Sequence, residues 1–277
     1  MAAPRARRNT TFIAALLYLI SIPFLILTLI GNTHDKPVLR DTYFFKLDVS
    51  QIIPIAVANA GLLNSVARSL GLHDFYQVGV WNFCEGFNDV GITYCSPPKT
   101  FYWFNPVQIL VSELLAGAQI ALPSEVLTIL KLLEIGSKVM YAFFMAGAVI
   151  NLVLLLGTPL VMRTRWFSLF LSVLGGFSGL ILIVAAIIAT VISVAAKVAL
   201  TAQDQLNIRA DIGVKMFAFM WIGALTTVFA FLLHAAMGCC CKPQRKRAFN
   251  EASPEPSMKK TMPALPSFIR RRKGAAP

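Results

Sequence analysis

The residues of this chain that could carry out chemistry are its five cysteines, and the first two lie in an aromatic-rich polar stretch. Cys84 and Cys95 enclose a loop of about a dozen residues. The turn-forming residues between them are Gly86, Asn88, Asp89 and Gly91. In an oxidising compartment this pattern favours a disulfide, to which the chain-entropy model assigns about 3 kcal/mol. Two free, buried thiols are the alternative.

The other three cysteines stand together, between an apolar run and a cluster of basic residues. They are Cys239, Cys240 and Cys241, and the basic residues that follow are Lys242, Arg245, Lys246 and Arg247. Cysteines beside a membrane span are typical sites of S-palmitoylation. Basic side chains there attract anionic lipid headgroups, at about 1 kcal/mol per charge. An unmodified anchor and a metal site are the alternatives, although no nearby His or acid completes a tetrahedral ligand set.

The three histidines do not form a recognisable catalytic or metal site. His34, His73 and His234 are far apart in the sequence and lack the spacing of metal ligands. The chain also lacks a nucleophile elbow and a phosphate-binding loop. We therefore interpret each histidine as a solvated or interface residue, and expect no enzymatic activity, no cofactor and no bound metal.

The composition is that of a membrane protein. Hydrophobic residues make up 57% of the 277 residues and charged residues only 14%, with a mean hydropathy of +0.68. Soluble domains have roughly 45–50% apolar and about 25% charged residues. The net charge of +12 would suggest a nucleic-acid partner only if the basic residues formed one face or groove, and we expect no such partner.

Four apolar runs are long enough to cross a bilayer core of about 30 Å as helices. They are residues 12–30, 139–162, 166–196 and 213–237. The first run follows the basic N-terminal residues 1–11 and could be a cleaved signal peptide. It is longer than the apolar region of such a peptide, and no small-residue cleavage site follows it. We therefore expect it to be retained as the first span.

The third run is too long for a simple span, because its 31 residues make a helix of about 46 Å. We expect its end to project from the membrane, with Ser193 and Lys197 in water. Only residues 163–165 separate it from the second run, so the two helices must form a tight hairpin.

Two features within the spans predict contacts between helices. Asn151 is the only amide at depth, and we expect it to bond to a neighbouring helix. The third run contains a group of closely spaced small residues, Ser172, Gly175, Gly176 and Gly179. They favour close packing inside a four-helix bundle over a dimer interface.

The segments between the spans differ in size. Residues 31–138 form a large first loop and residues 197–212 a short second one. In the first loop we predict helices at Asn59 to Leu72 and at Ser124 to Lys138, packed within the ectodomain. The apolar stripe of the second of these helices is Val126, Ile129, Leu130 and Leu133. The proline-rich, basic tail, residues 238–277, is predicted to be disordered and has a candidate phosphorylation site at Ser253, before a proline.

The distribution of charge predicts the topology. With four spans, the two termini and the tight turn lie on one side of the membrane and have a net charge of +13. The two larger loops, with Lys215 included, have a net charge of −1. The positive-inside rule therefore places both termini in the cytoplasm. It also places Cys84 and Cys95 outside, where a disulfide persists.

The amino-acid sequence of the first loop resembles that of a known family. Gly79, Val80 and Trp81 precede the two cysteines in the spacing G-V-W-x-x-C-x10-C. This spacing is similar to the first-loop signature of the claudin-like superfamily. The longer stretch, VGVWNFCEGFNDVGITYCSPPKTFYWFNPV, looks most like the fungal Sur7/PalI family. The short tail favours the Sur7 branch.

The resemblance implies a fold class and a function. The fold would be an all-α membrane protein with a four-helix bundle and a disulfide-containing first outer loop. In that loop Gly79, Trp81 and the two cysteines would stabilise the ectodomain. The function would be that of a non-enzymatic plasma-membrane protein of the fungal cell cortex, which organises membrane domains (eisosomes) in wall integrity, endocytosis or cell fusion. Its partners would be membrane lipids, lateral neighbours or copies of itself, and the cell wall. A channel component or regulator, and an ambient-pH signalling protein, are the alternatives.

Overall fold

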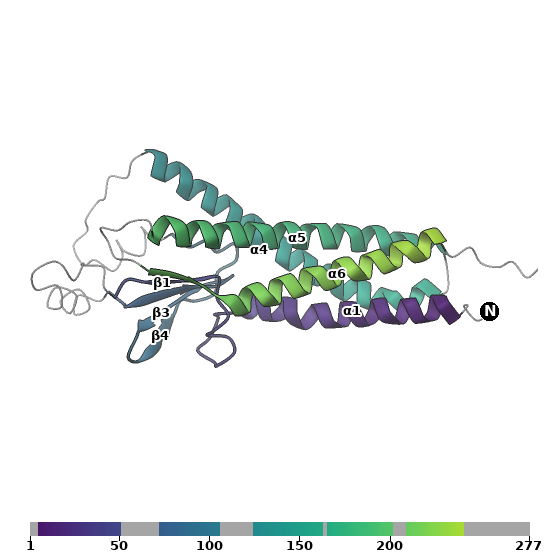
Figure 1. Cartoon of the computed structure of the whole chain (residues 1–277), viewed down its shortest axis with the longest axis horizontal. Coiled ribbons are helices and arrows are strands. Elements are labelled where there is room, and N and C mark those ends of the chain that lie inside the picture. Colours follow the sequence, from purple (N-terminus) through teal and green to yellow (C-terminus); the bar gives the residue numbers. More distant parts are fainter. Residues whose placement is uncertain (1–4, 51–71, 106–123, 163–164, 202–208, 241–277) are drawn as a thin grey trace, which may run out of the picture. The chain divides into compact units, whose positions relative to one another are not determined.

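The computed structural model describes residues 5–50, 72–105, 124–162, 165–201 and 209–240 (Figure 1). Four long helices form the bundle: α1 (Arg5–Ile30), α4 (Ser124–Gly157), α5 (Arg165–Thr201) and α6 (Val214–Cys240). A short 3-10 helix, Thr158–Met162, ends α4. Helix α1 packs against α6 and α4, and α5 packs against α4 and α6. Each of the four long helices is apolar enough to cross a membrane over 23 residues or more.

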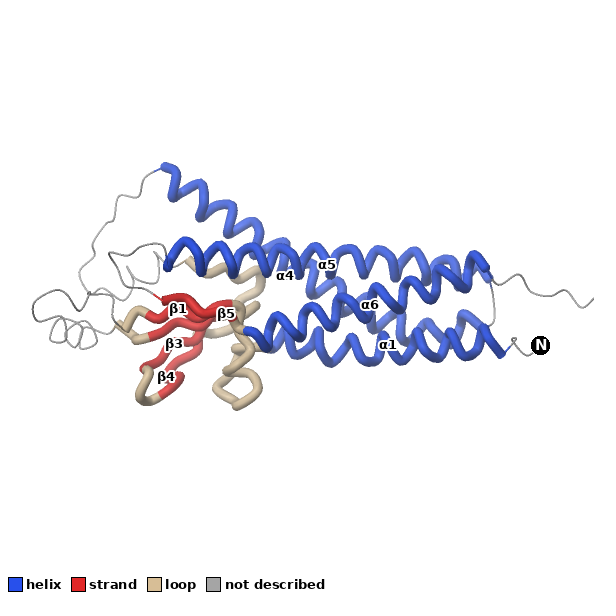
Figure 2. Tube along the Cα trace, viewed as in Figure 1, coloured by secondary structure: helices blue, strands red, loops and turns tan. Residues whose placement is uncertain are grey.

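A five-stranded antiparallel sheet lies at one end of the bundle (Figure 2). Its strands are β1 (Phe45–Asp48), β2 (Phe75–Val78), β3 (Phe83–Phe87), β4 (Gly91–Cys95) and β5 (Arg209–Ile212), in the order β4-β3-β2-β1-β5. In β1, Phe45 and Leu47 are buried while the residues between and after them are half-buried, as expected for a strand with one face on a core. The sheet belongs to the same compact unit as the bundle.

Both loops contribute to this sheet. Strand β1 from the first loop pairs with β5 from the second, so that Phe45 stands between Val78 on one side and Ile212 on the other. Buried side chains of the sheet, of α5 and of α6 form one continuous core. A second, smaller core of the bundle contains Tyr18, Leu154 and Leu171.

The four-helix bundle with a disulfide-containing loop is confirmed, but the all-α description leaves out the sheet. The strands have only four or five residues each, which is too short for a clear alternation of apolar and polar residues in the sequence. Their pairing is between segments far apart in the chain, which local sequence patterns do not encode. The predicted helix at residues 59–72 lies almost entirely outside the described residues.

The helix predicted at Ser124 to Lys138 is present, but it is continuous with the second span as α4. On this helix Glu134 and Lys138 form an i,i+4 ion pair. The stripe on this helix does not pack as a whole, because Ile129 is 65% exposed. Leu133 of this stripe lies beside the strand residues Phe45 and Val78.

The end of α5 differs from the expectation of a helix end in water. The helix extends to Thr201 and contacts β1 and β5, so the sheet covers one of its faces. Ser193 is therefore completely buried, and its predicted exposure is wrong. Lys197 is half-buried.

Candidate functional site

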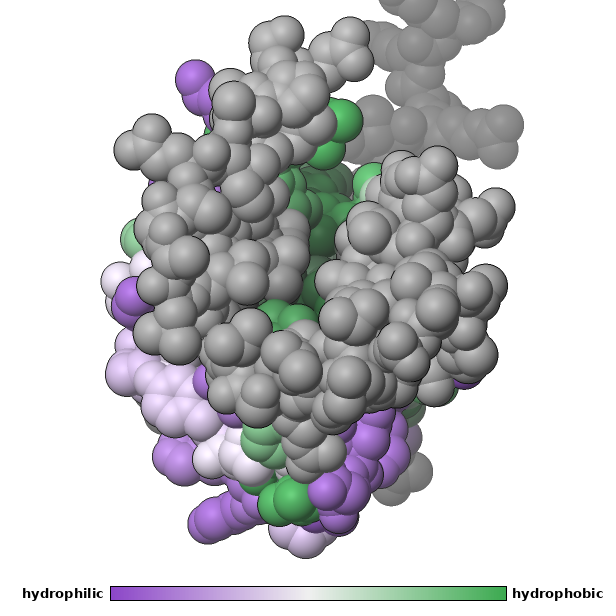
Figure 3. All heavy atoms as spheres, turned by 90° about the vertical axis from the view of Figure 1, so that its left-hand side faces the viewer, coloured by the Kyte–Doolittle hydropathy of each residue, from purple (hydrophilic) through white to green (hydrophobic). Residues whose placement is uncertain are grey.

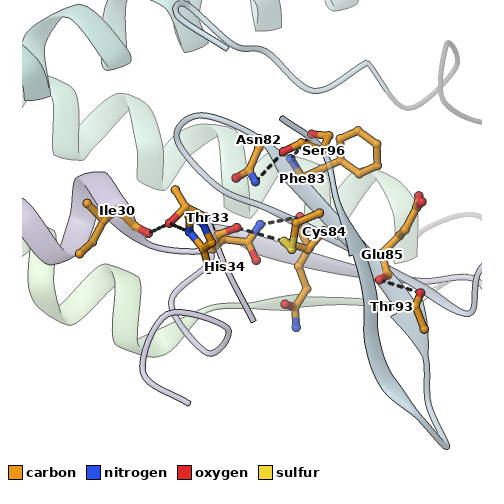
Figure 4. The surroundings of a disulfide bond; sticks show 12 residues. Ile30, Thr33, His34, Asn82, Phe83, Cys84, Glu85, Thr93 and Ser96 are labelled. Atoms are coloured by element: carbon orange, nitrogen blue, oxygen red, sulfur yellow. Dashed lines mark hydrogen bonds between the residues drawn. A yellow bond between two sulfur atoms is a disulfide. The ribbon is translucent and has the colours of Figure 1, made fainter. Parts of the chain in front are cut away.

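The two cysteines of the first loop form a disulfide between neighbouring strands. Cys84 and Cys95 are directly opposite each other on β3 and β4 and are bonded through their sulfur atoms. The Cys84 sulfur is buried and lies 3.0 Å from the carbonyl oxygen of Asn32 (Figure 4). Because a disulfide sulfur carries no proton, this is a contact and not a hydrogen bond. The disulfide therefore attaches the hairpin to the residues that follow α1.

The predicted turn residues between the cysteines have different roles. Asn88 and Asp89 lie in the hairpin turn, and Gly91 begins β4 with a φ of 94°, a conformation that favours glycine. Gly86, by contrast, is in the middle of β3 at an irregularity in the register, so its predicted place in a turn is wrong. A Cβ atom at Gly86 would overlap the backbone of Gly91 across the hairpin. Glycine is needed there for close approach of two strands, not for a turn.

The tight turn after β2 contains the first residues of the motif. The amide of Gly79 donates to the carbonyl of Asn82 at 2.9 Å, which closes this turn. Asn82 is buried, and its side-chain amide donates to the carbonyl of Ser96 at 3.0 Å. The turn is thereby fixed to the residue that follows Cys95.

Gly79 also brings this turn against the end of α1. A Cβ atom at Gly79 would lie 2.9 Å from the Cβ atom of Asn32 and 2.9 Å from the carbonyl oxygen of Gly31. Asn32 is buried with a φ of 60°, and its amide donates to the carbonyl of Gln77 at 3.0 Å. A larger residue at position 79 would push the ends of β2 and β3 away from Gly31 and Asn32. The motif glycine therefore allows the sheet to pack against the residues that follow the first helix.

Trp81 joins the same turn to α4. Its ring meets the ring of Tyr141 edge-on, with centroids 4.9 Å apart. Phe101 packs against the same tyrosine at 5.0 Å. The carbonyl of Trp81 accepts a hydrogen bond of 2.8 Å from the amide of Lys99. The motif residues thus contact the residues that follow α1, helix α4 and the segment after β4, and they hold these parts together.

Polar side chains link the hairpin to the rest of the sheet. The amide of Asn88 donates to a carboxylate oxygen of Asp74 at 3.0 Å, and the Asn88 side chain reaches Asp48 at 3.4 Å. His73 is half-buried, and its Nδ1 atom lies 3.8 Å from Glu85 Oε2. Among the described residues, no group of three or more His, Cys, Asp or Glu side chains could hold a metal ion.

A second group of charges surrounds the start of α6. Lys215 Nζ is 2.7 Å from a carboxylate oxygen of Asp41. The pKa of Tyr43 is raised by burial and by the nearby carboxylates of Asp211 and Asp41. These groups connect the two loops where β5 leads into α6.

Within the spans, a hydrogen-bonded network joins all four helices. The Asn151 amide of α4 donates to Ser178 of α5 at 3.4 Å, and its oxygen accepts from Thr227 of α6 at 3.2 Å. Thr227 also lies 2.8 Å from Ser21 of α1. Asn151 therefore bonds to neighbouring helices, as the sequence predicts. Such bonds between spans contribute about 0.6 kcal/mol each, so the network orients the helices more than it stabilises them.

The glycines of α5 pack against other helices of the bundle. Cβ atoms at Gly176 and Gly179 would meet Phe231 and Val228 of α6, and one at Gly175 would lie 2.8 Å from the Tyr18 hydroxyl of α1. These contacts agree with packing inside the bundle.

His234 is a buried residue that the sequence analysis assigned to solvent or an interface. It lies in α6, is 1% exposed, and stacks on the ring of Tyr18 with centroids 5.8 Å apart. That assignment is therefore wrong. The sequence did contain a signal for its burial. His234 lies in the fourth apolar run, four residues after Ala230, and residues four apart share one face of a helix; Ala230 faces the same core.

The candidate sites of the tail lie at the end of the described residues or beyond it. Cys239 and Cys240 are the last residues of α6, and Cys241 follows the described residues. The basic cluster Lys242, Arg245, Lys246 and Arg247 and the candidate phosphorylation site Ser253 also lie outside them.

Four membrane-length helices, a sheet built from two loops, and a disulfide beside a Gly-Val-Trp turn define a four-span membrane protein with a folded sheet at one end of its helix bundle. The profile of the SUR7/PalI family matches residues 10–233, so the chain belongs to this family.

Two curated relatives from yeasts are similar to this chain. The "SUR7 family protein pun1" of Schizosaccharomyces pombe is 26% identical over 252 residues, which cover 76% of this chain and 86% of the relative. "Protein PUN1" of Saccharomyces cerevisiae is 24% identical over 132 residues, covering 48% of this chain and 50% of that protein. The family resemblance in the first loop is thus confirmed.

Proposed function

We propose that this chain is a non-enzymatic organiser of membrane domains in the fungal plasma membrane, at the cell cortex. Its roles would be of the class that includes cell-wall integrity, endocytosis and cell fusion. The observation that supports the proposal is the packing of two residues of the family motif. Gly79 packs against the residues that follow α1, and Trp81 packs against α4, so the sheet is attached to both. A rigidly attached ectodomain is suited to contacts with the wall or with lateral neighbours.

The topology of the proposal has both termini in the cytoplasm and the sheet outside. It is supported by the excess of basic residues in the termini and the tight turn. The disulfide between Cys84 and Cys95 supports the same orientation, because disulfides persist outside the cytosol.

Exposed apolar side chains of the ectodomain are candidates for lateral contacts. Val90 in the hairpin turn is 67% exposed, and Tyr94 on the edge strand β4 is also exposed. An edge strand without charged side chains offers free backbone groups to a neighbour. We propose that this edge takes part in lateral association, with a second copy or with another cortical membrane protein.

Fluorescence recovery after photobleaching tests this function. The tagged chain is expected to form immobile cortical puncta in a fungal cell. Replacement of Val90 and Tyr94 by serine is expected to raise the mobile fraction about tenfold, if the edge contributes about 1.4 kcal/mol to association. Val38→Ser, at another exposed apolar residue of the ectodomain, is the matched control. A uniformly mobile unmodified protein would count against an organising role.

The tail is proposed to hold the protein to the inner leaflet. Cys239, Cys240 and Cys241 would be acylated, and the basic residues after them would bind anionic lipid. Phosphate at Ser253 would weaken that attraction.

Thiol labelling of the intact protein checks the anchor: label is expected at the three cysteines only after hydroxylamine, and at Cys84 and Cys95 only after reduction. Free labelling of Cys84 and Cys95 before reduction would contradict the proposed orientation.

A channel component or regulator is the second candidate, because the architecture is claudin-like. The network of Ser21, Asn151 and Thr227 argues against a pathway through one copy, since its side chains bond helix to helix in the bundle interior. The central parts of the described spans also carry no Asp, Glu, Lys or Arg. Unchanged conductance in membranes with this protein, alone and beside a channel, would remove the candidate.

For the ambient-pH signalling alternative, the corresponding test is growth of a deletion strain at alkaline pH.

A further inference from the structure

A loop of exposed residues, 97–101, follows the disulfide-bonded hairpin. Just before it, the amide of Ser96 donates to the carbonyl of Phe83 at 2.9 Å. Within it, the amide of Lys99 donates to the carbonyl of Trp81 at 2.8 Å. Two consecutive prolines at its start restrict the backbone further, because the proline ring fixes φ. The loop therefore presents its side chains from a defined position beside the motif turn.

Phe101 ends this loop in an unusual conformation. Its φ is 53°, in the left-handed region that a bulky side chain rarely adopts. Such a conformation persists only where the surrounding structure holds it, and such residues are concentrated at functional sites. Here the ring packs against Tyr141 of α4, yet the residue is 51% exposed. The loop thus holds an aromatic ring at the surface of the molecule instead of burying it.

The hydrogen-bonded network of the spans shows at what level this ring lies. Ser21, Thr227 and Asn151 are joined by hydrogen bonds and therefore lie at one level of the bundle. Toward the sheet, α1 ends at Ile30, nine residues after Ser21. In the same direction, Tyr141 is ten residues before Asn151 on α4. At about 1.5 Å per residue, both are about 14–15 Å from the network, so Tyr141 is level with the end of the first span.

This level coincides with one boundary of the hydrocarbon core. The first span, Arg8–Ile30, has 23 residues and a length of about 34 Å, close to the thickness of a bilayer core of about 30 Å. With Arg8 at one boundary, the ring of Phe101 lies at the other. Aromatic residues are typical of this level, and Trp81 and Tyr141 meet there as well. Beyond it, hydrophilic and nearly neutral colours prevail among the described atoms in the lower part of Figure 3, as expected for a sheet in water.

Lys99 supplies a positive charge two residues before the ring. Its side chain is exposed and forms no ion pair with the described residues. A lysine side chain can lie along apolar surface while its ammonium group stays in water. A phospholipid at the boundary matches both side chains, because it has acyl chains at the level of the ring and a phosphate group farther out. The loop is also continuous with the lipid-exposed surface of the bundle, which favours lipid over a second copy of the chain.

We propose that residues 97–101 form an interfacial loop that binds the membrane leaflet on the side of the sheet. The ring of Phe101 lies among the first methylene groups of the phospholipid acyl chains, and the ammonium group of Lys99 binds their phosphate groups. Because the loop is bonded to Trp81 and rests on Tyr141, the contact sets the orientation of the sheet on the membrane surface. It requires only that the four helices span a bilayer, and it is independent of the proposed function.

Photo-crosslinking of the full-length chain tests this contact. Phe101 is replaced by the photoreactive analogue p-benzoylphenylalanine, and the purified chain is irradiated in phosphatidylcholine nanodiscs. We expect the peptide that contains residue 101 to gain the mass of one phosphatidylcholine molecule. The matched control has the analogue at Val90, which is 67% exposed in the hairpin turn at the other end of β3 from Trp81. The lipid adduct is expected to be lost there, because water surrounds that turn.

Two variants of Lys99 test the charge. In nanodiscs that also contain phosphatidylglycerol, the adducts at position 101 are expected to be enriched in this anionic lipid about fivefold over its bulk ratio, the effect of one basic residue near the surface. Lys99→Gln is expected to return the adducts to the bulk ratio, whereas Lys99→Arg is expected to keep the enrichment. Equal enrichment with and without the charge would contradict the binding of phosphate by Lys99.

The other outcomes also decide the proposal. A crosslinked dimer from position 101 would assign the ring to a second copy, and crosslinks confined to the chain itself would show that the ring does not reach lipid. Either result, or equal lipid adducts at positions 101 and 90, would overturn the interfacial loop. Formation of the Cys84–Cys95 disulfide on a non-reducing gel verifies that each variant is folded. Should the analogue at position 101 prevent folding, the exposed Thr100 is the second position for it, with the same adduct expected.

Discussion

Replacing Cys84 and Cys95 together with alanine is expected to destabilise the five-stranded sheet by about 3 kcal/mol, the value for a native disulfide that closes a short loop. The loss would be concentrated in the sheet, because the disulfide joins β3 to β4 and its buried sulfur contacts the residues after α1. Alanine is preferred to serine at Cys84, since a serine hydroxyl would be buried there.

Hydrogen exchange of the purified protein measures this loss. Peptides from β1 to β4 are expected to exchange faster by about two orders of magnitude, which corresponds to about 3 kcal/mol. Peptides from the centres of α1 and α6 are expected to keep their rates and serve as an internal control. Treating the unmodified protein with a reductant should reproduce the effect. Unchanged exchange in β3 and β4 would mean that the disulfide does not stabilise the sheet.

Gly213→Ala is expected to have a comparable effect, of about 3 kcal/mol, at the junction between β5 and α6. A Cβ atom at this position would overlap the carbonyl oxygen of Tyr43, a backbone atom that cannot rotate away. The amide of Gly213 also donates to the carbonyl of Phe44 at 3.2 Å. The substitution must therefore separate β5 from the segment that leads into β1, and with it the second loop from the first.

Gly223→Ala is the matched control for this prediction. It lies in the same helix, α6, but a Cβ atom there would mainly meet the end of the Leu25 side chain, which can change rotamer. Thermal unfolding in detergent is expected to show a lower midpoint for Gly213→Ala than for Gly223→Ala. Hydrogen exchange is expected to be faster in β1 and β5 for Gly213→Ala alone. Equal effects of the two substitutions would contradict the role of the Tyr43 carbonyl.

The sequence alone determined the four spans, the disulfide and the family. The spans are evident because a bilayer requires uninterrupted apolar helices, and each such helix is one continuous apolar stretch of the sequence. The pairing of Cys84 with Cys95 was predictable because the two cysteines are close in sequence and separated by turn formers. The contact of Asn151 with other helices was predictable because an amide in hydrocarbon must find a partner.

Only the tertiary structure decided which surfaces meet. The pairing of β1 with β5 joins segments more than 150 residues apart, and no local pattern in either strand specifies its partner. For the same reason Ser193 was expected in water but lies beneath the sheet, and His234 was expected to be a solvated or interface residue but is buried against Tyr18. Hydrophobicity along a helix determines that it crosses the membrane, whereas burial on each of its faces depends on neighbours from distant parts of the chain.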